Sequence, residues 1–346
     1  MIRRASWFWT VLVVLLAASP LAAQVERLRS LDQVQRLPPV EPEPEPYPGR
    51  ILSFSDSGSG VMKPLLDAPR DTPPAEEVDP DRPRDARPGM FQKLIFNSAW
   101  LTSSGHDAWD MTDLELKTAL AIPIPSRRWP MVVTPGFAVH FLNGPAAPDL
   151  PPKVFDSYVQ FRWWRRFCPR FGLDVAVTPG LYGDYQQTGD GALRITGYAA
   201  GVFTWTPEAR IVLGATYQDR PDYPVLPIAG VTWTPREDVK CDLVFPRPKI
   251  AKRILWSGAC TEDLQDWIYV AGELGGGIWA VQRPGVTDVI TYRDYRAILG
   301  LERWDLVGLD FKLELAWVFG RKLTFRSGTP DAFPSDGLLL SGGVTY

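Results

Sequence analysis

Charged residues whose types could select ions gather between residues 247 and 296. They are Arg247, Lys249, Arg253, Glu273, Asp294 and Arg296. Guanidinium and ammonium groups attract anions, and carboxylates attract cations. If these side chains lined a water-filled passage, they would therefore act as an ion filter. The alternative for the basic residues, which include Lys252, is a solvated loop or a contact with charged headgroups.

Hydrolytic chemistry has little support in the sequence. The histidines of the chain are His106 and His140. A hydrolase would need one of them beside a serine and an orienting amide or acid. Asn143 is near His140, but no serine shares its strand face two residues on, and Ser157 is a weak substitute. We therefore predict that the protein is not an enzyme and that His140 is an ordinary rim or interior residue.

Cofactor and metal chemistry also lack a motif. The three cysteines, Cys168, Cys241 and Cys260, show no metal-ligand spacing. One disulfide or three free thiols remain open. Gly275-Gly276-Gly277 is not a phosphate loop, because no Lys-Ser/Thr pair follows it; bare backbone there instead permits close packing. We predict no cofactor and no metal, and a net charge of -3 is too weak to suggest nucleic acid.

The stretch from Val307 to Gly320 shows what kind of element positions these charges. Apolar residues occupy every second place from Val307 to Phe319, and charged or small residues such as Lys312 and Glu314 alternate with them. This period of two is typical of a strand with one oily face. The run is longer than the usual soluble strand and long enough to cross a bilayer when tilted.

The same alternation recurs along the chain after Met90. Clear examples are residues 112–122, 155–163, 171–178, 193–205, 211–218 and 239–245, and weaker ones are 91–102, 131–142, 225–234, 267–282 and 290–303. Strands that follow one another without helices between them favour an antiparallel all-β domain. In a barrel, Arg220, Asp222 and Arg293 could join the interior ion pairs with Glu273.

The connections between these strands alternate in length. Short ones are residues 125–130, 167–170, 206–208 and 234–238, and long ones are 143–153, 182–192, 218–223 and 327–336. Short turns at one end and long loops at the other are typical of outer-membrane barrels. The turn parity requires one extra strand between Val239 and Trp267, for which residues 250–256 are the candidate. Counting it gives about 14 strands, and merging weak strands gives about 12.

The N-terminal segment predicts export. Arg3 and Arg4 precede a short apolar run that ends at small residues, which is typical of a signal peptide cleaved near Ala23. Residues 24–89 are rich in proline and acidic residues and predict a disordered or semi-rigid linker. The barrel is expected at residues 90–346. Leu338, Leu340, Gly342, Val344 and Tyr346 then form a last alternating strand that must close against the first.

Two stretches carry a family resemblance. The first is residues 223–235 with residues 242–249, and the second is residues 272–280 with residues 292–296. With them, the region from residue 90 to residue 346 resembles a family of uncharacterised, planctomycete-type bacterial outer-membrane β-barrels. The resemblance implies the fold and an outer-membrane location. It implies no activity, because the family has no assigned function.

Together these observations predict an all-β, transmembrane, antiparallel up-and-down barrel in the bacterial outer membrane. The first hypothesis for function is a pore for small polar solutes. The second is a non-conducting structural or interaction barrel whose linker reaches the cell wall or a periplasmic partner. A soluble secreted sandwich is the alternative fold. The expected partner is outer-membrane lipid, and the oligomeric state is left open.

Overall fold

The computed structural model describes residue 87 and residues 89–105, 107–126, 129–144, 149–186, 191–221, 223–259, 262–305 and 308–346. The predicted signal peptide and almost all of the predicted linker lie outside these residues, as do His106, Asp222 and Cys260. The described residues form strands, turns and irregular segments but no helix. Accordingly, none of them belongs to a helix long and apolar enough to cross a membrane.

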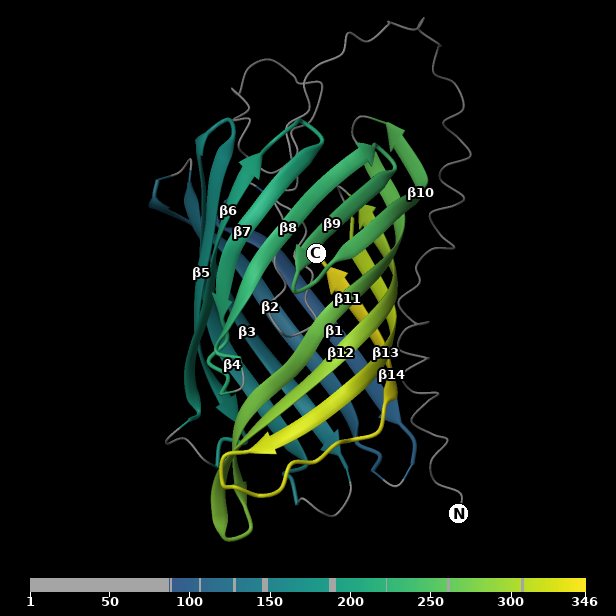
Figure 1. Ribbon diagram of the computed structural model, residues 1–346. Coiled ribbons are helices and arrows are strands. Elements are labelled where there is room, and N and C mark those ends of the chain that lie inside the picture. Colours follow the sequence, from purple (N-terminus) through teal and green to yellow (C-terminus); the bar gives the residue numbers. More distant parts are fainter. Residues whose placement is uncertain are drawn as a thin grey trace, which may run out of the picture. The chain divides into compact units, whose positions relative to one another are not determined.

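Fourteen antiparallel strands close into one ring (Figure 1). They are β1 (Phe91–Ser103), β2 (Asp110–Pro125), β3 (Pro130–Asn143), β4 (Lys153–Cys168), β5 (Phe171–Gly183), β6 (Leu193–Thr204), β7 (Ala209–Tyr217), β8 (Val225–Arg236), β9 (Val239–Phe245), β10 (Lys249–Ala259), β11 (Glu262–Arg283), β12 (Val286–Asp305), β13 (Asp310–Phe325) and β14 (Gly337–Thr345). Each strand pairs with its neighbours in the sequence. The predicted up-and-down barrel is confirmed, and the count is 14 rather than 12.

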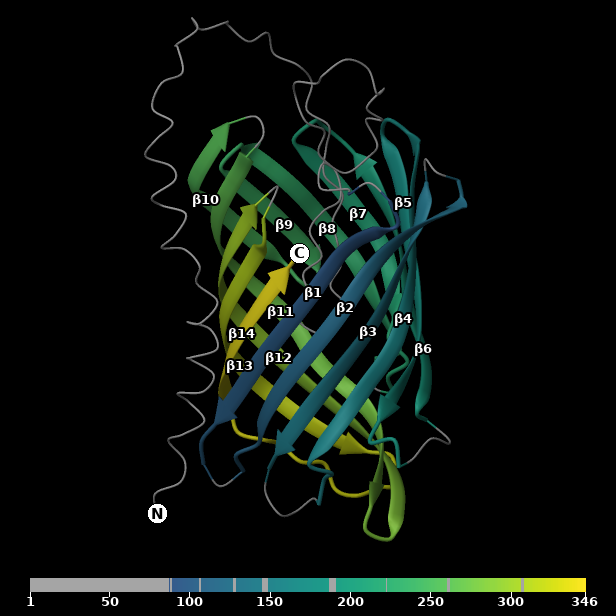
Figure 2. The ribbon, with the colours of Figure 1, turned by 180° about the vertical axis from the view of Figure 1, so that it is seen from behind.

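The ring closes between its first and last strands, which lie side by side when the barrel is seen from behind (Figure 2). The ladder runs from Ile95 opposite Thr345 to Ser103 opposite Gly337. Leu94 and Tyr346 then exchange backbone hydrogen bonds of 2.9 and 2.8 Å. The C-terminal strand therefore has the closing role that its alternating sequence predicts.

The strict alternation of strand direction puts the four predicted long connections at one end of the barrel and the four predicted short ones at the other. We call these the long-loop end and the short-turn end. The predicted extra strand at residues 250–256 is β10, which makes this parity consistent. Two later connections at the long-loop end are short, however, because β9 joins β10 through residues 246–248 and β11 joins β12 through residues 284–285.

The two faces of the sheet separate as their alternation predicts. On β13, Leu313, Leu315 and Trp317 are about half exposed on the outside, whereas Glu314 and Ala316 between them are buried inside. Large apolar side chains are exposed in the same way around the ring, on strands from β1 to β14. The outside of the barrel is therefore apolar, and its charged residues point mostly inward.

The phase of this alternation changes within β13, at a shift in its ladder with β12. The register between them shifts between Arg293 and Tyr295, and Gly320 has a positive φ of 60°. After the shift, Arg321, Leu323 and Phe325 are the buried residues of β13. A strand read with one uninterrupted period of two therefore assigns these three to the wrong face.

The hairpin of β11 and β12 is much longer than its neighbours, at 22 and 20 residues against 7 in β9 and 11 in β10. Beyond the end of β10, β11 continues across the long-loop end and pairs with β5 at Ala280 and Gly183. The strands β11 to β14 and β1 to β5 therefore form a smaller ring there, which leaves out β6 to β10.

Apolar side chains fill this smaller ring. Trp109, Trp279 and Tyr292 are almost fully buried in one cluster with residues of β1, β3, β4 and β14. A narrow ring leaves room for side chains rather than for water, since barrel diameter grows with strand number. Arg321 enters the cluster and bonds the Tyr292 hydroxyl at 3.0 Å and the carbonyls of Ser335 and Trp109 at 2.7 and 2.6 Å. These contacts fix the β13–β14 loop over the long-loop end.

Candidate functional site

Arg247 is the centre of an ion-pair cluster inside the barrel. Its Nε lies 3.0 Å from Glu273 Oε2, and its Nη2 lies 2.7 Å from Glu314 Oε1. All three side chains are nearly inaccessible to solvent. A buried carboxylate is strongly disfavoured unless a cation pairs with it. Arg247 therefore stabilises two carboxylates that come from β11 and β13.

The short hairpin of β9 and β10 puts Arg247 in this place. The β10 ladder with β11 ends at Lys249 opposite Ala271, and Gly272 N donates to Pro248 O at 2.9 Å. The turn therefore lies halfway along β11 instead of at its end. From that height the arginine points into the barrel, so the basic run at Arg247 and Lys249 is not a solvated loop.

Glu314 and Glu302 extend the cluster across the interior. Glu314 accepts hydrogen bonds from the Tyr269 hydroxyl at 2.6 Å and from Ser341 at 3.0 Å, and Lys312 Nζ lies 3.1 Å from it. Glu302 pairs with Lys249 at 2.7 Å. These contacts join β10 to β14 by side chains, and the cluster has no large excess of either charge.

The glycine triplet explains how Arg296 and Asp294 fit beside Glu273. Arg296 pairs with Asp294 at 2.9 Å and with Glu273 at 3.6 Å. A Cβ on Gly275 would lie only 2.0 Å from Asp294 Oδ1. The prediction that this triplet allows close packing over bare backbone is therefore confirmed, and the packed groups are an ion pair.

The remaining residues of the predicted set lie apart from this cluster. Arg253 is on β10 near the short-turn end, with its guanidinium 4.8 Å from the Trp256 ring and 5.7 Å from the Trp267 ring. Lys252 is exposed on the outer face. Arg293 contacts the Tyr223 hydroxyl at 3.4 Å. The structure therefore brings together Arg247, Lys249, Glu273, Asp294 and Arg296, but not Arg253.

A second cluster surrounds His140. Its Nδ1 lies 2.7 Å from Asp113 Oδ1 and its Nε2 lies 3.1 Å from Asp156 Oδ2. The other oxygen of Asp156 accepts a hydrogen bond of 2.8 Å from Trp279 Nε1. Ser157 faces the opposite side of β4 and contacts Tyr185, so the arrangement that hydrolysis would need is not assembled at this histidine. The cluster instead attaches the β11–β12 hairpin to the opposite wall.

Sequence reasoning missed the acidic partners of this histidine. Asp113, His140 and Asp156 come from three consecutive strands, and pairing puts Asp113 opposite His140. His140 pairs with Val154, and Asp156 is two residues further along β4. All three belong to the inward set of their strands, so strand register was the signal that could have joined them.

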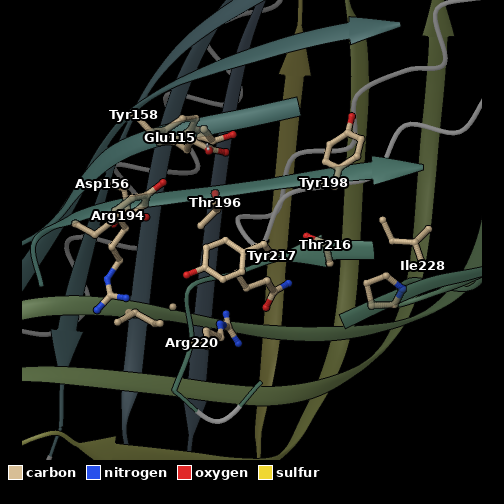
Figure 3. Close-up of a pocket in the computed structure, with 16 residues that line it drawn as sticks. Glu115, Asp156, Tyr158, Arg194, Thr196, Tyr198, Thr216, Tyr217, Arg220 and Ile228 are labelled. Carbon is tan, nitrogen blue, oxygen red and sulfur yellow. Dashed lines mark hydrogen bonds between the residues drawn. The ribbon is translucent and has the colours of Figure 1, made fainter. Parts of the chain in front are cut away.

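A third group of polar residues lines a cavity of about 100 Å³ near the long-loop end (Figure 3). Glu115 and Asp156 lie on the side of β2 and β4, while Arg194 and Arg220 come from β6 and the β7–β8 loop. Glu115 accepts hydrogen bonds from Tyr158 at 2.6 Å and Asn97 at 2.9 Å. Arg194 Nη1 donates to Asp219 O at 2.7 Å. The cavity therefore presents hydroxyls and charges of both signs.

Metal and disulfide chemistry are not assembled in the part of the chain that the structure describes. It contains no group of three or more His, Cys, Asp or Glu residues that could hold a metal ion. Cys168 is exposed and Cys241 is buried, and neither forms a disulfide. What the described interior can do chemically is bind and orient small polar or charged groups.

The fold and the interior define a class: a closed, 14-stranded antiparallel barrel with an apolar outside and a polar inside. No family model matches the chain, and no curated protein matches it. Among solved structures, it is similar to an outer membrane channel from Pseudomonas putida F1, with 11% identity and a TM-score of 0.35. The match covers 80% of this chain and 99% of that one. A likeness this distant carries no argument about function, and the predicted membership of a planctomycete-type family stays a prediction.

Proposed function

We propose that the protein is an outer-membrane β-barrel that forms a narrow, charge-lined channel for small polar solutes. The observation that carries the proposal is that the apolar face of the sheet is outside and the charged face is inside, the reverse of a soluble protein. Large apolar side chains are exposed on the outside, and ion pairs are buried inside. A soluble protein seldom exposes such a continuous apolar surface, whereas a barrel in lipid requires one.

Backbone pairing supports a location in lipid. Within hydrocarbon every backbone polar group must find a partner inside the protein, and a closed barrel provides this for strands. The ring of this chain is closed from β1 to β14. Because the sequence predicts an export signal and an alternating strand that closes the ring, the proposed membrane is the bacterial outer membrane. The short-turn end, where β1 begins and β14 ends, would then face the periplasm.

The filling of the interior supports passage of small solutes only. The long-loop end is occupied by the apolar cluster around Trp109 and Tyr292, and the middle is crossed by the Arg247 cluster. The cavity described above is a hollow that remains beside them. Solutes would meet hydroxyls, carboxylates and guanidinium groups, so selection by charge is expected.

Single-channel recording of the purified protein in a planar bilayer tests this function. Reproducible current steps, together with a reversal potential in a salt gradient, would support a channel and give its ion preference. A barrel that is demonstrably folded, for example by its heat-modifiable migration in a gel, and yet silent over a wide range of voltage would overturn the proposal.

A second candidate function is a non-conducting structural or interaction barrel. The observation that favours it is the dense packing of the smaller ring at the long-loop end. In this case the segment before residue 90 would contact the cell wall or a periplasmic partner. Deleting residues 24–88 would then reduce retention of that partner without affecting barrel folding, whereas the conductance of a channel would not depend on the segment. That the protein is not an enzyme stays a prediction.

A further inference from the structure

The wall of the barrel is interrupted where the large ring becomes the smaller one. The β10–β11 ladder ends at Ala271 and the bond from Gly272 N to Pro248 O. The next sheet partner of β11 is Gly183 on β5, opposite Ala280. Between these two places, the edge of β11 faces the ends of β6 to β9 instead of a neighbouring strand. A barrel wall in lipid normally has no such break in its ladder.

The cavity near the long-loop end lies at this interruption. It is lined by Gly277 and Ile278 of β11, by Pro246 of the β9–β10 turn, and by Gln218 and Arg220 of the β7–β8 loop. Residues on the other side are Thr196 and Tyr198 of β6 (Figure 3). The cavity is therefore bounded by strand ends that come from both sides of the break.

Two tyrosines show that the cavity passes around the edge of the wall. Tyr198 is a buried residue of the inner face, and Tyr217 is an exposed residue that the alternation of β7 assigns to the outer face. Tyr217 pairs with Gly197, the neighbour of Tyr198 in the sequence. Both tyrosines line the same cavity. A hollow inside a continuous wall would touch the inner face alone, so this one reaches both sides.

The surroundings of the opening differ between the two sides. Leu193, Ile195 and Val225 lie at the ends of β6 and β8 and are each more than half exposed on the outer face. The inner side instead presents the hydroxyls of Tyr158 and Tyr198, the carboxylate of Glu115 and the guanidinium of Arg194. The opening therefore has an apolar outer margin and a polar inner wall.

We propose that this opening is a lateral portal through which a small amphipathic solute passes between the barrel interior and the surrounding lipid. Its polar head would bind the hydroxyls and charges of the inner wall, and its apolar part would pass along Leu193, Ile195 and Val225. The portal offers a way past the apolar cluster that fills the long-loop end. It rests on the proposed channel function, since a solute must also travel through the rest of the interior.

Fluorescence quenching from the lipid side tests the portal directly. A bimane label is placed at a single cysteine in the protein in which Cys168, Cys241 and Cys260 are changed to serine. The tested position is Thr196→Cys on the cavity wall, with Thr216→Cys as a second one. Quenchers are lipids brominated in the acyl chain and, from water, iodide. We expect both quenchers to reduce the fluorescence at both positions.

Two matched positions calibrate the result. Ala199→Cys is on the outer face of β6 and reports full quenching by brominated lipid. Thr232→Cys is buried on the inner face of β8, where Arg210 and Asp242 on the adjacent strands complete the ladder, so lipid should not quench it. If positions 196 and 216 are as insensitive to brominated lipid as position 232, the wall is sealed and the portal is wrong.

Conductance of the protein without its three native cysteines distinguishes failure of the portal proposal from failure of the channel proposal. Current steps without lipid quenching at positions 196 and 216 would leave the channel in place and overturn the portal. Lipid quenching in a barrel that shows no current steps would contradict the proposed channel function, and with it the passage of a solute through the portal. It would support only an opening of the wall to lipid. Quenching at one of the two positions is enough to support the opening, so failure of one variant to fold does not prevent the test.

Discussion

Ala280 on β11 pairs with Gly183 on β5, although the five strands β6 to β10 separate them along one side of the ring. The amide of Asp184 donates to Ala280 O at 3.1 Å, and the Asp184 carboxylate accepts from Gln282 N at 2.7 Å. No side chain fits at residue 183, because a Cβ there would lie 2.2 Å from Ala280 O. This bridge narrows the long-loop end and creates the interruption of the wall.

The hydrogen bond from Trp279 to Asp156 is expected to help hold the hairpin against β4. Trp279→Phe removes the Nε1 donor but keeps a ring against His140. We therefore expect the free energy of unfolding to fall by about 1.5–3 kcal/mol, the usual value for a hydrogen bond to a charged group. Hydrogen exchange of the hairpin amides, residues 276–290, should become faster while exchange in β1 and β14 stays unchanged. Unchanged exchange in the hairpin would show that the bond does not hold it.

The backbone at Gly276 is expected to tolerate no side chain. Its φ is 133°, and a Cβ would lie 2.1 Å from Tyr292 O. Gly276→Ala should therefore displace the hairpin and lower the yield of folded barrel. Gly285→Ala is the matched control, since Gly285 also has a positive φ, of 75°, but has no atom within 4 Å of the added Cβ. Gly285→Ala should lower the folding stability by about 1–2 kcal/mol, from backbone strain alone. Equal losses of stability in the two variants would contradict the packing argument.

Removal of Arg247 is expected to leave two buried carboxylates without their shared cation. Arg247→Met should destabilise the barrel by about 3–5 kcal/mol, the usual cost of breaking a buried pair. It should also move the reversal potential towards cation preference, because Glu273 and Glu314 keep their charge. Adding Glu314→Gln to this variant should restore part of the stability and part of the original reversal potential. If the double variant is no more stable than the single one, the pairing does not account for the loss.

The proposed contact of the outer surface with lipid is tested by a charge at the middle of β13. Leu315 is about half exposed on the outside. Leu315→Lys should destabilise the barrel in a bilayer by about 2–4 kcal/mol if the residue lies near the midplane. Denaturant unfolding from vesicles measures this, with Leu315→Ile as the neutral control. A lysine variant as stable as the isoleucine variant would show that this face does not lie in hydrocarbon.

Alternation and turn parity made most of the fold predictable from the sequence. The faces of β2, β4, β6 and β13 follow directly from a period of two, and the extra strand at residues 250–256 follows from the need for an even number of crossings. These features are local, or depend on simple counting. Physical requirements of a barrel then determine which strands pair, because neighbours in the sequence are neighbours in the ring.

The site was less predictable because it depends on departures from that regularity. Because β9 is much shorter than β11, Arg247 lies level with the middle of β11. The alternation of apolar and polar residues does not show where a strand ends, so the sequence could not predict this position. The contact between Ala280 and Gly183 joins residues far apart in the ring, without any periodic pattern. The register shift between β12 and β13 reverses the faces of β13 after Gly320, which puts Arg321 inside the barrel. Such shifts change the face of every later residue.

The pairing of β1 with β14 has a consequence for synthesis and quality control. The bonds that close the ring need residues 337–345 of β14, the strand that is synthesised after the other thirteen. A product of interrupted translation that lacks them would have two unpaired strand edges, one on β1 and one on β13. Such edges cannot persist in hydrocarbon. In the proposed membrane location, insertion into lipid can therefore distinguish a chain that carries β14 from one that lacks it by its hydrogen bonds alone.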